Sequence, residues 1–260
     1  MSPFELTCYG VGDGWPCADR NHSSFHYRFG KTSFIVDCGE SVSRSFKASG
    51  LSYDSFEAIL LSHLHCDHIG GFFMFMQGLW LEKRQKDLPI YLPEDGIKPM
   101  RELLNAGMIF EELLAFTPQY TPLHVGKSFK VKDVKVTPFP TTHLESLRKS
   151  FQRKYPLEFA AYSFLLETAK LRIAHSADIG APKDLDPLLE KPVDLLVCEL
   201  AHFEPKDLFR YLKGRDIGRI VFMHVARQYR EEQTAINKLA SRYLGEIPFT
   251  FATDGMRVEM

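Results

Sequence analysis

Three histidines and one aspartate fall within six consecutive positions of this chain, in the stretch SHLHCDHIGG at 62–71. They are His63, His65, Asp67 and His68. The apolar run 58–61 that precedes them predicts a buried strand, and the apolar stretch 72–81 that follows predicts a helix that runs to about Arg84. The chain is therefore expected to present these four side chains on a loop between the end of a strand and a helix.

The types and spacing of these residues predict a metal site. His63 and His65 are two positions apart, so an extended backbone turns both side chains the same way. Imidazole and carboxylate suit zinc and other first-row divalent metals. Four ligands in six residues are too many for one ion, so we expect two ions, one bound by His63 and His65 and the other by Asp67 and His68. The alternative is a polar surface loop, but buried His and Asp need partners and a metal supplies them.

Single polar residues also follow later predicted strands. They are His143 after strand 134–139, Asp178 after strand 170–174 and His224 after strand 219–223. The carboxyl ends of strands are the usual place for sites in α/β folds. We expect His143 to complete the ligands of the first ion and His224 those of the second. Asp178 is expected to bridge both ions with its two oxygens, the alternative being a turn aspartate.

Three further features each have a structural and a functional interpretation. Glu199 and His202 could together deliver a proton to a leaving oxygen, or could form a structural ion pair. Asp37, at the end of a predicted strand, could orient a ligand histidine or cap a turn. The basic segment 148–154 could steer an anionic substrate or be a solvated helical face. Its positive residues are Arg148, Lys149, Arg153 and Lys154.

Composition sets the broad class of the protein. The 260 residues are 45% hydrophobic, which allows one large core, and we expect a single domain over 1–260. A net charge of −1 gives no reason to expect a nucleic acid or membrane partner. Five scattered cysteines without a CxxC pair, and no signal or membrane-spanning stretch, predict a cytoplasmic protein. Near the C-terminus, Asp254-Gly255 predicts a hairpin turn.

The ligand pattern resembles the metallo-β-lactamase superfamily, whose HxHxDH signature matches 63–68 and whose later single ligands match His143, Asp178 and His224 in order. The resemblance implies an α/β fold, a four-layer αββα sandwich of two mixed β-sheets with helices on the outer faces. It also implies a dinuclear site, usually of zinc, in which His63, His65 and His143 bind one ion. Asp67, His68 and His224 would bind the other ion, and Asp178 would bridge.

Within that superfamily the chain is most similar to the ribonuclease Z branch, which processes the 3′ ends of tRNA. The segments RNHSS at 20–24, DCGE at 37–40 and HVARQY at 224–229 resemble its blocks, as does Glu199. The interval from His143 to Asp178 has room only for a short basic segment and a hairpin, in place of that branch's long tRNA-binding arm. The branch's later histidine partner of the glutamate has no counterpart, although His202 could substitute, and Ala226 replaces a serine.

These observations predict a metal-dependent hydrolase in which two divalent ions activate a bridging water. Asp67 or Asp178 would orient the water, and Glu199 with His202 would help the leaving group. We expect zinc, with manganese or iron as alternatives, and a small or cyclic nucleotide-type phosphodiester as substrate. The other candidates are a tRNA 3′ endonuclease, a hydrolase of lactones, thioesters or sulfate esters, and an inactive metal-binding scaffold. Helix 72–81 is apolar nearly all round, so a homodimer is a further expectation.

Overall fold

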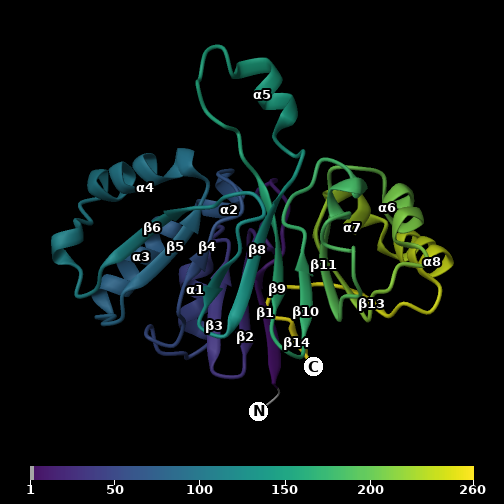
Figure 1. The fold of residues 1–260 in the computed structure, drawn as a ribbon, viewed down its shortest axis with the longest axis horizontal. Helices are drawn as coiled ribbons and strands as arrows, with labels where there is room; N and C mark the ends of the chain where they lie inside the picture. Colours follow the sequence, from purple (N-terminus) through teal and green to yellow (C-terminus); the bar gives the residue numbers. More distant parts are fainter. Residues whose placement is uncertain (1–2) are drawn as a thin grey trace. The chain divides into compact units, whose positions relative to one another are not determined.

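The computed structural model describes residues 3–260, which form two compact units, each built around one seven-stranded β-sheet (Figure 1). The first unit contains the residues up to Leu123, together with Val131–Asp133 and Thr253–Met260. The second contains His124–Lys130 and Val134–Ala252. Each unit has its own hydrophobic core and carries part of the predicted ligand set.

The sheet of the first unit has the strand order β14-β1-β2-β3-β4-β5-β6 and is mixed. Its strands are β1 (Phe4–Gly10), β2 (Ser24–Phe29), β3 (Thr32–Val36), β4 (Ile59–Leu60), β5 (Leu88–Leu92), β6 (Pro118–Pro122) and β14 (Arg257–Glu259). The pairs from β14 to β3 are antiparallel and those from β3 to β6 are parallel. The helices are α1 (Val42–Ala48), α2 (Cys66–Ile69), α3 (Phe72–Leu81), α4 (Glu94–Ala106) and the 3-10 helix η1 (Glu111–Leu113).

Helix α3 packs one face into the core of the first unit, which explains its apolar sequence. Phe75 lies between Phe46 of α1 and Phe56, with ring centroids 5.3 and 5.7 Å away. Met74, on the other face, is 54% exposed. The helix ends at Leu81, three residues before the expected Arg84, because Lys83 takes a left-handed conformation (φ 56°) that no helix continues.

The sheet of the second unit is also mixed, with the order β13-β12-β11-β10-β9-β8-β7. Its strands are β7 (Phe129–Val131), β8 (Val134–Pro140), β9 (Tyr162–Glu167), β10 (Arg172–His175), β11 (Leu195–Leu200), β12 (Ile220–Val225) and β13 (Phe249–Phe251). Strands β10 to β13 run parallel. The helices are α5 (Glu145–Phe151), the 3-10 helix η2 (Pro182–Leu185), α6 (Pro205–Leu212), α7 (Arg227–Glu231) and α8 (Gln233–Leu244).

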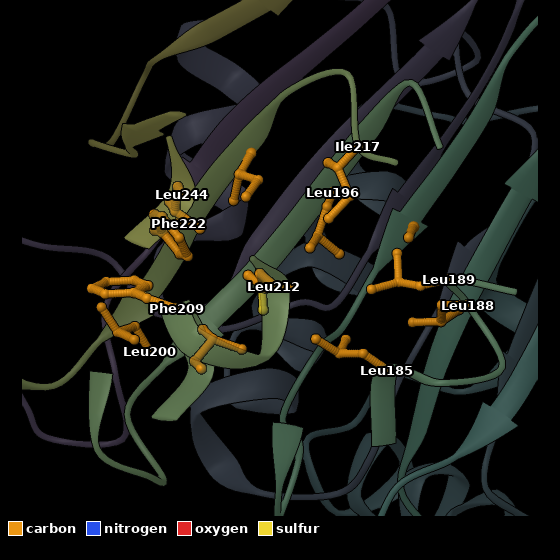
Figure 2. Packing of buried hydrophobic residues seen from close by; sticks show 14 of the residues in the cluster. Leu185, Leu188, Leu189, Leu196, Leu200, Phe209, Leu212, Ile217, Phe222 and Leu244 are labelled. Carbon is orange, nitrogen blue, oxygen red and sulfur yellow. The ribbon is translucent and has the colours of Figure 1, made fainter. Parts of the chain in front are cut away.

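Figure 2 shows the core of the second unit, where α6 and α8 cover one face of the parallel strands. Phe209 of α6 contacts Phe222 of β12 at a centroid distance of 5.3 Å. Leu196 of β11 and Leu244 of α8 belong to the same cluster. Burying each such side chain contributes about 1.5–3 kcal/mol to stability. This packing makes the parallel strands a rigid base for the loops at their carboxyl ends.

Two mixed sheets with helices confirm the predicted α/β fold class. The predicted hairpin at Asp254-Gly255 is wrong, because β13 pairs with β12 and β14 pairs with β1, in the other sheet. The turn is real, with Gly255 at φ 78°, but the Asp254 carboxylate accepts hydrogen bonds from the backbone N–H groups of Val11 and Asn21. Among residues 3–260, no helix is both long enough and apolar enough to cross a bilayer.

Candidate metal centre

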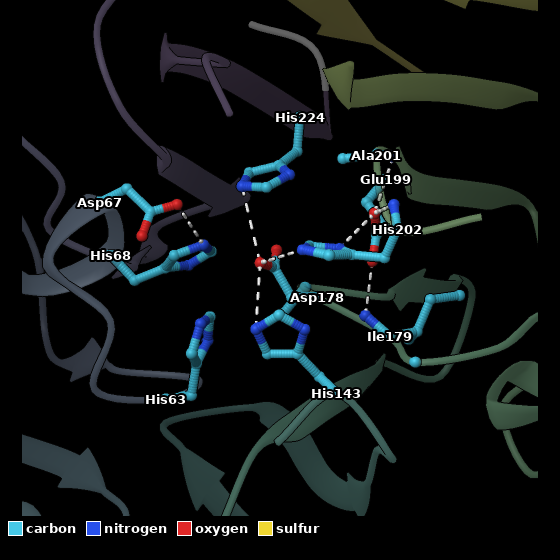
Figure 3. Close-up of polar contacts among 12 residues, drawn as sticks. His63, Asp67, His68, His143, Asp178, Ile179, Glu199, Ala201, His202 and His224 are labelled. Carbon is cyan, nitrogen blue, oxygen red and sulfur yellow. Dashed lines mark hydrogen bonds and ion pairs between the residues drawn. The ribbon is translucent and has the colours of Figure 1, made fainter. Parts of the chain in front are cut away.

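The first ligand cluster follows β4, where the prediction put it. The chain stays extended through His65 (φ −65°, ψ 147°) and then enters α2. The rings of His63 and His65 are 4.8 Å apart between centroids, and those of His63 and His68 are 4.1 Å apart. Asp67 Oδ2 lies 3.4 Å from His68 Nε2 (Figure 3). All four predicted residues of this segment are therefore brought together within the first unit.

The buried carboxylate of Asp37 orients two of these histidines. Its Oδ2 accepts hydrogen bonds from His68 Nδ1 (2.7 Å) and from the Ser62 hydroxyl (2.8 Å), and its Oδ1 accepts one from the Ser62 backbone N–H (2.7 Å). Because the Ser62 hydroxyl donates its proton to Asp37, Ser62 Oγ accepts a hydrogen bond from His63 Nδ1–H, 3.0 Å away. Both rings therefore carry their proton on Nδ1 and present the Nε2 lone pair. This is the arrangement that supports metal-ligating histidines.

Tight backbone packing holds the ligand loop against the end of β3. Cys38 donates its backbone N–H to the carbonyl of His68 at 2.7 Å. A Cβ on Gly39 would lie 2.4 Å from the Asp67 carbonyl, so only glycine allows this approach. Asp37 itself is left-handed (φ 60°), a conformation that Asp tolerates better than most residues. Local geometry thus requires glycine at position 39 and favours aspartate at position 37.

The second ligand cluster converges on Asp178 in the second unit (Figure 3). Its Oδ2 lies 3.6 Å from His143 Nε2, 3.5 Å from His224 Nε2 and 3.9 Å from His202 Nε2. Two ligands on one tetrahedral ion with bonds of 2.0–2.2 Å are about 3.3–3.6 Å apart. The separations from His143 and His224 fit that spacing, as does the 3.4 Å between Asp67 and His68 in the first unit. The donor sets of both clusters therefore fit divalent metal ions.

A β-bulge and left-handed backbone conformations set the directions of these side chains. The register between β11 and β12 shifts so that Leu200 pairs with Val225, and His224 is the extra residue of a β-bulge with φ 49°. Bulges re-aim a side chain and are frequent beside active sites. Ala177, just before Asp178, is also left-handed at φ 45°. Such conformations are costly and persist where the surrounding structure imposes them.

Glu199 and His202 form a contact pair at the end of β11. His202 Nδ1 is 2.8 and 2.9 Å from the two carboxylate oxygens of Glu199, so this nitrogen carries the proton. Glu199 is fully buried and also accepts hydrogen bonds from the backbone N–H groups of Ile179 and Ala201. His202 is one-third exposed, and its Nε2 points toward Asp178. Both predicted residues thus lie within the second cluster.

Asp184 is a supporting residue that the sequence reasoning missed. Its Oδ2 accepts hydrogen bonds from Thr142 N and Thr142 Oγ1, both at 2.8 Å, and from Gly180 N at 2.9 Å. It therefore ties the loop before His143 to the loop after Asp178. The only signal in the sequence was a proline and an aspartate at the start of a short helical turn.

The basic segment forms α5 and the loop after it, where Arg148, Lys149, Arg153 and Lys154 are all exposed. Lys149 pairs with Glu145 at 3.1 Å. Figure 1 shows α5 projecting from the strands of its own unit. The interval between His143 and Asp178 holds this helix, its loop and two strands, as expected for a chain without a long arm. His175, the last residue of β10, is fully buried.

Comparison with known proteins agrees with this fold. The chain is 35% identical over 104 residues to a ribonuclease Z of Methanococcus maripaludis, a match that spans 40% of this chain and 33% of that protein. The chain thus spans less than half of the length of the curated relatives it matches. The metallo-β-lactamase fold protein YhfI of Bacillus subtilis superposes with a TM-score of 0.79 at 19% identity, covering 99% of this chain and all of that one. Yeast PDE1 gives 0.73 at 14% identity, covering both chains completely.

The two sheets and the HxHxDH loop agree with the metallo-β-lactamase fold, and the partial match to ribonuclease Z agrees with the resemblance that the sequence predicted. A more specific match covers residues 4–214, four-fifths of the chain. The chain belongs to the family of the anti-Pycsar protein Apyc1.

Proposed function

We propose that this protein is a metal-dependent phosphodiesterase that hydrolyses a small or cyclic nucleotide. Two divalent metal ions would be bound by ligands from both clusters, with zinc as the first candidate. His63, His65 and His143 would hold one ion, Asp67, His68 and His224 the other, and Asp178 both. When bound, such ions lower the pKa of a water molecule and polarise a phosphoryl oxygen.

The observation that carries the proposal is the approach of two imidazole Nε2 atoms to one carboxylate oxygen of Asp178, at 3.5 and 3.6 Å. Imidazoles and a carboxylate that converge at ligand-to-ligand spacing, on strained backbone, are costly unless a cation joins them. In the first unit, the Asp37–Ser62 hydrogen bonds already hold two further Nε2 atoms in the ligating tautomer. Both donor sets are thus prepared before any metal binds.

His202 would act as the proton donor to the leaving group. The Glu199 carboxylate accepts a hydrogen bond from His202 Nδ1–H, which would stabilise a positive charge on the ring. His202 Nε2, near Asp178, would then be the atom that exchanges a proton. Because His202 is one-third exposed, a substrate oxygen can reach it. A phosphodiester with an alkoxide leaving group needs such a donor.

A ribonuclease Z-type tRNA endonuclease is the second candidate, and the identity to the archaeal ribonuclease Z supports it. The short interval from His143 to Asp178 favours a small substrate, because α5 has only seven residues and no arm extends from it to grip tRNA. Lactones, thioesters and sulfate esters are further candidates, because activated water attacks any of these electrophiles.

The test is hydrolysis by protein loaded with zinc or manganese, whose metal content is measured in the same sample. Bis(p-nitrophenyl) phosphate, 3′,5′-cyclic nucleotides and a 3′-extended tRNA precursor are compared, with Asp178→Asn as control. We expect turnover of the first two substrates that the variant loses. Protein that holds about two ions per chain yet leaves all three phosphodiesters intact would overturn the proposal. Faster turnover of the tRNA precursor would favour the second candidate.

A further inference from the structure

His143 and Asp178 follow two strands that are not neighbours in the sheet of the second unit. His143 comes after β8 and Asp178 after β10, and β9 lies between these two strands. Adjacent strands are about 4.8 Å apart, so strands on either side of a third are about 9.6 Å apart. His143 Nε2 nevertheless lies 3.6 Å from Asp178 Oδ2. The loops after β8 and β10 therefore have to approach each other across the end of β9.

The two loops come into backbone contact at Gly180. A Cβ on Gly180 would lie 2.4 Å from Thr142 Oγ1 and 2.7 Å from the carbonyl carbon and oxygen of Thr142. Only glycine allows the two loops to come this close. Thr141 Oγ1 adds a hydrogen bond to the carbonyl of Asp178 at 2.8 Å. The contact is thus one residue from His143 and two residues from Asp178.

Asp184 joins the two loops at this contact. Its Oδ2 accepts hydrogen bonds from the backbone N–H and the hydroxyl of Thr142, both at 2.8 Å, and from the backbone N–H of Gly180 at 2.9 Å. The residue is only 8% exposed, and hydrogen bonds to a buried carboxylate are among the strong ones. One oxygen atom therefore holds both loops. We call Thr142, Gly180 and Asp184 the clasp.

The Asp178 loop has a second anchor on its other side. Glu199 Oε1 accepts a hydrogen bond from the backbone N–H of Ile179 at 2.6 Å, which fixes this loop to β11, the strand that pairs with β10. Asp178 is therefore held in place even without the clasp. The clasp acts chiefly on the approach of His143 to Asp178.

We propose that the clasp positions His143 as a metal ligand, by holding its imidazole at the distance from Asp178 that one ion requires. This inference rests on the ligand set of the proposed function. Residues that orient a ligand typically change metal affinity about 10–100-fold when they are replaced. The ion that His143 would bind should therefore depend on the clasp. The other ion, which has no ligand on this loop, should not.

Three variants open the clasp in different ways. Asp184→Asn removes the charge, whereas Thr142→Val and Gly180→Ala keep every charge and remove a donor or force the loops apart. Zinc titration against a fluorescent chelator should show two ions in the wild type. In Asp184→Asn and Gly180→Ala, one of the two should bind about 10–100-fold more weakly. Thr142→Val should weaken the same ion about 10-fold, and Thr142→Ser, which keeps the hydroxyl, should bind both ions like the wild type.

Matched controls lie at the opposite end of the same sheet. A Cβ on Gly218 would lie 2.7 Å from the carbonyl oxygen of Asp194, and Asp194 Oδ2 accepts a hydrogen bond from the backbone N–H of Arg172 at 2.7 Å. Gly218→Ala and Asp194→Asn should lower the melting temperature as the clasp variants do, but should leave the affinity for both ions unchanged. This comparison separates the positioning of a ligand from a general loss of stability.

The dependence of turnover on zinc concentration gives a second readout. In the clasp variants, kcat for bis(p-nitrophenyl) phosphate should be low at limiting zinc and should recover as zinc is raised, which a damaged fold would not allow. Wild-type zinc affinity in Gly180→Ala would overturn the inference. An effect in Asp184→Asn alone would also overturn it, because the loss of a charge would then be sufficient. Equal weakening of both ions would assign the clasp to the fold and not to His143.

The same measurements separate this inference from the proposed function. If the wild type holds two ions but hydrolyses no phosphodiester, the proposed function fails, and the zinc titrations still decide the role of the clasp. If phosphodiesters are hydrolysed but the clasp variants bind both ions like the wild type, the function stands and the positioning role fails.

Discussion

The two ligand clusters are built in opposite ways. In the first unit, four residues from one stretch of six positions are held by one buried network around Asp37. In the second unit, His143, Asp178 and His224 come from three separate strand ends and meet only because the sheet brings those ends together. The first cluster is a local structure, whereas the second is a product of tertiary packing. The two should therefore respond differently to mutation.

The clusters also differ in how their histidines are supported. Asp37 serves two rings in the first unit, one directly and one through the Ser62 hydroxyl. In the second unit, the buried carboxylate of Glu199 serves His202, the most exposed imidazole of the cluster. We therefore interpret Asp37 as a residue that prepares metal ligands and Glu199 as one that prepares a proton donor.

The largest effect is expected at Asp178. Asp178→Asn should lower kcat by about 10³-fold, the scale of losing one preorganised charge in an active site. It should exceed the effect of Asp67→Asn, because Asp178 would serve both ions and Asp67 only one. Kinetics with metal analysis of both variants provide the measurement. A greater loss in Asp67→Asn would mean that the local cluster, and not the assembled one, dominates the chemistry.

The next prediction concerns stability in acid, which should separate the two units. His26 of β2 is buried against Tyr9, with rings stacked at 5.8 Å, and burial lowers the pKa of His26 to about 4 from 6.5. The unfolded chain then binds more protons than the folded chain between these two values. The contribution of about 3 kcal/mol is thus complete above pH 6.5 and is lost as the pH falls toward 4.

Hydrogen exchange at pH 4.5 and pH 7 checks this expectation. Amides of the first unit should lose protection at the lower pH before those of the second unit, and His26→Phe should remove the difference. Equal acid sensitivity of wild type and His26→Phe would show that other groups control stability in this range.

A third prediction tests the assignment of His202. His202→Ala should lower kcat by about 10²-fold for a cyclic nucleotide, whose leaving alkoxide needs a proton. The same variant should hydrolyse bis(p-nitrophenyl) phosphate nearly as well as the wild type, because p-nitrophenolate leaves without protonation. Measuring kcat of the wild type and of His202→Ala with both substrates tests this prediction. Similar losses for both would assign His202 to metal binding instead.

The difference between the clusters also explains what could be predicted from the sequence. The first cluster was visible because its spacing is local, and α3 (Phe72–Leu81) was predicted from its apolar stretch, although its end was expected three residues later. The later ligands could be recognised only as polar residues after strands, with the family pattern to support them. Nothing local revealed the β-bulge at His224, since a register shift belongs to a pair of strands. The Asp254 turn was misread for the same reason, because its strands join different sheets.

Supporting residues were the hardest to predict. Asp37 had two interpretations of equal weight, because a carboxylate after a strand is common in turns. Ser62 gave no signal and Asp184 gave only that of a short helical turn, since their hydrogen-bond partners lie 25 and 42 positions away in the sequence. Hydrogen bonds of this kind depend on tertiary packing, which single residues do not encode.

The smallest effects are expected when the two supporting carboxylates are exchanged for amides. Asp37→Asn keeps a residue that tolerates the left-handed backbone and one oxygen for Ser62, but places an amide against His68 Nδ1–H or Ser62. It should weaken metal binding by about 10–100-fold. Glu199→Gln should leave metal affinity unchanged. Like His202→Ala, but to a smaller extent, it should lower kcat for the cyclic nucleotide and not for bis(p-nitrophenyl) phosphate. Metal titration and two-substrate kinetics on the same preparations separate these results. If Glu199→Gln weakened metal binding as strongly as Asp37→Asn, the two carboxylates would have the same task, and the functional distinction between the clusters would be wrong.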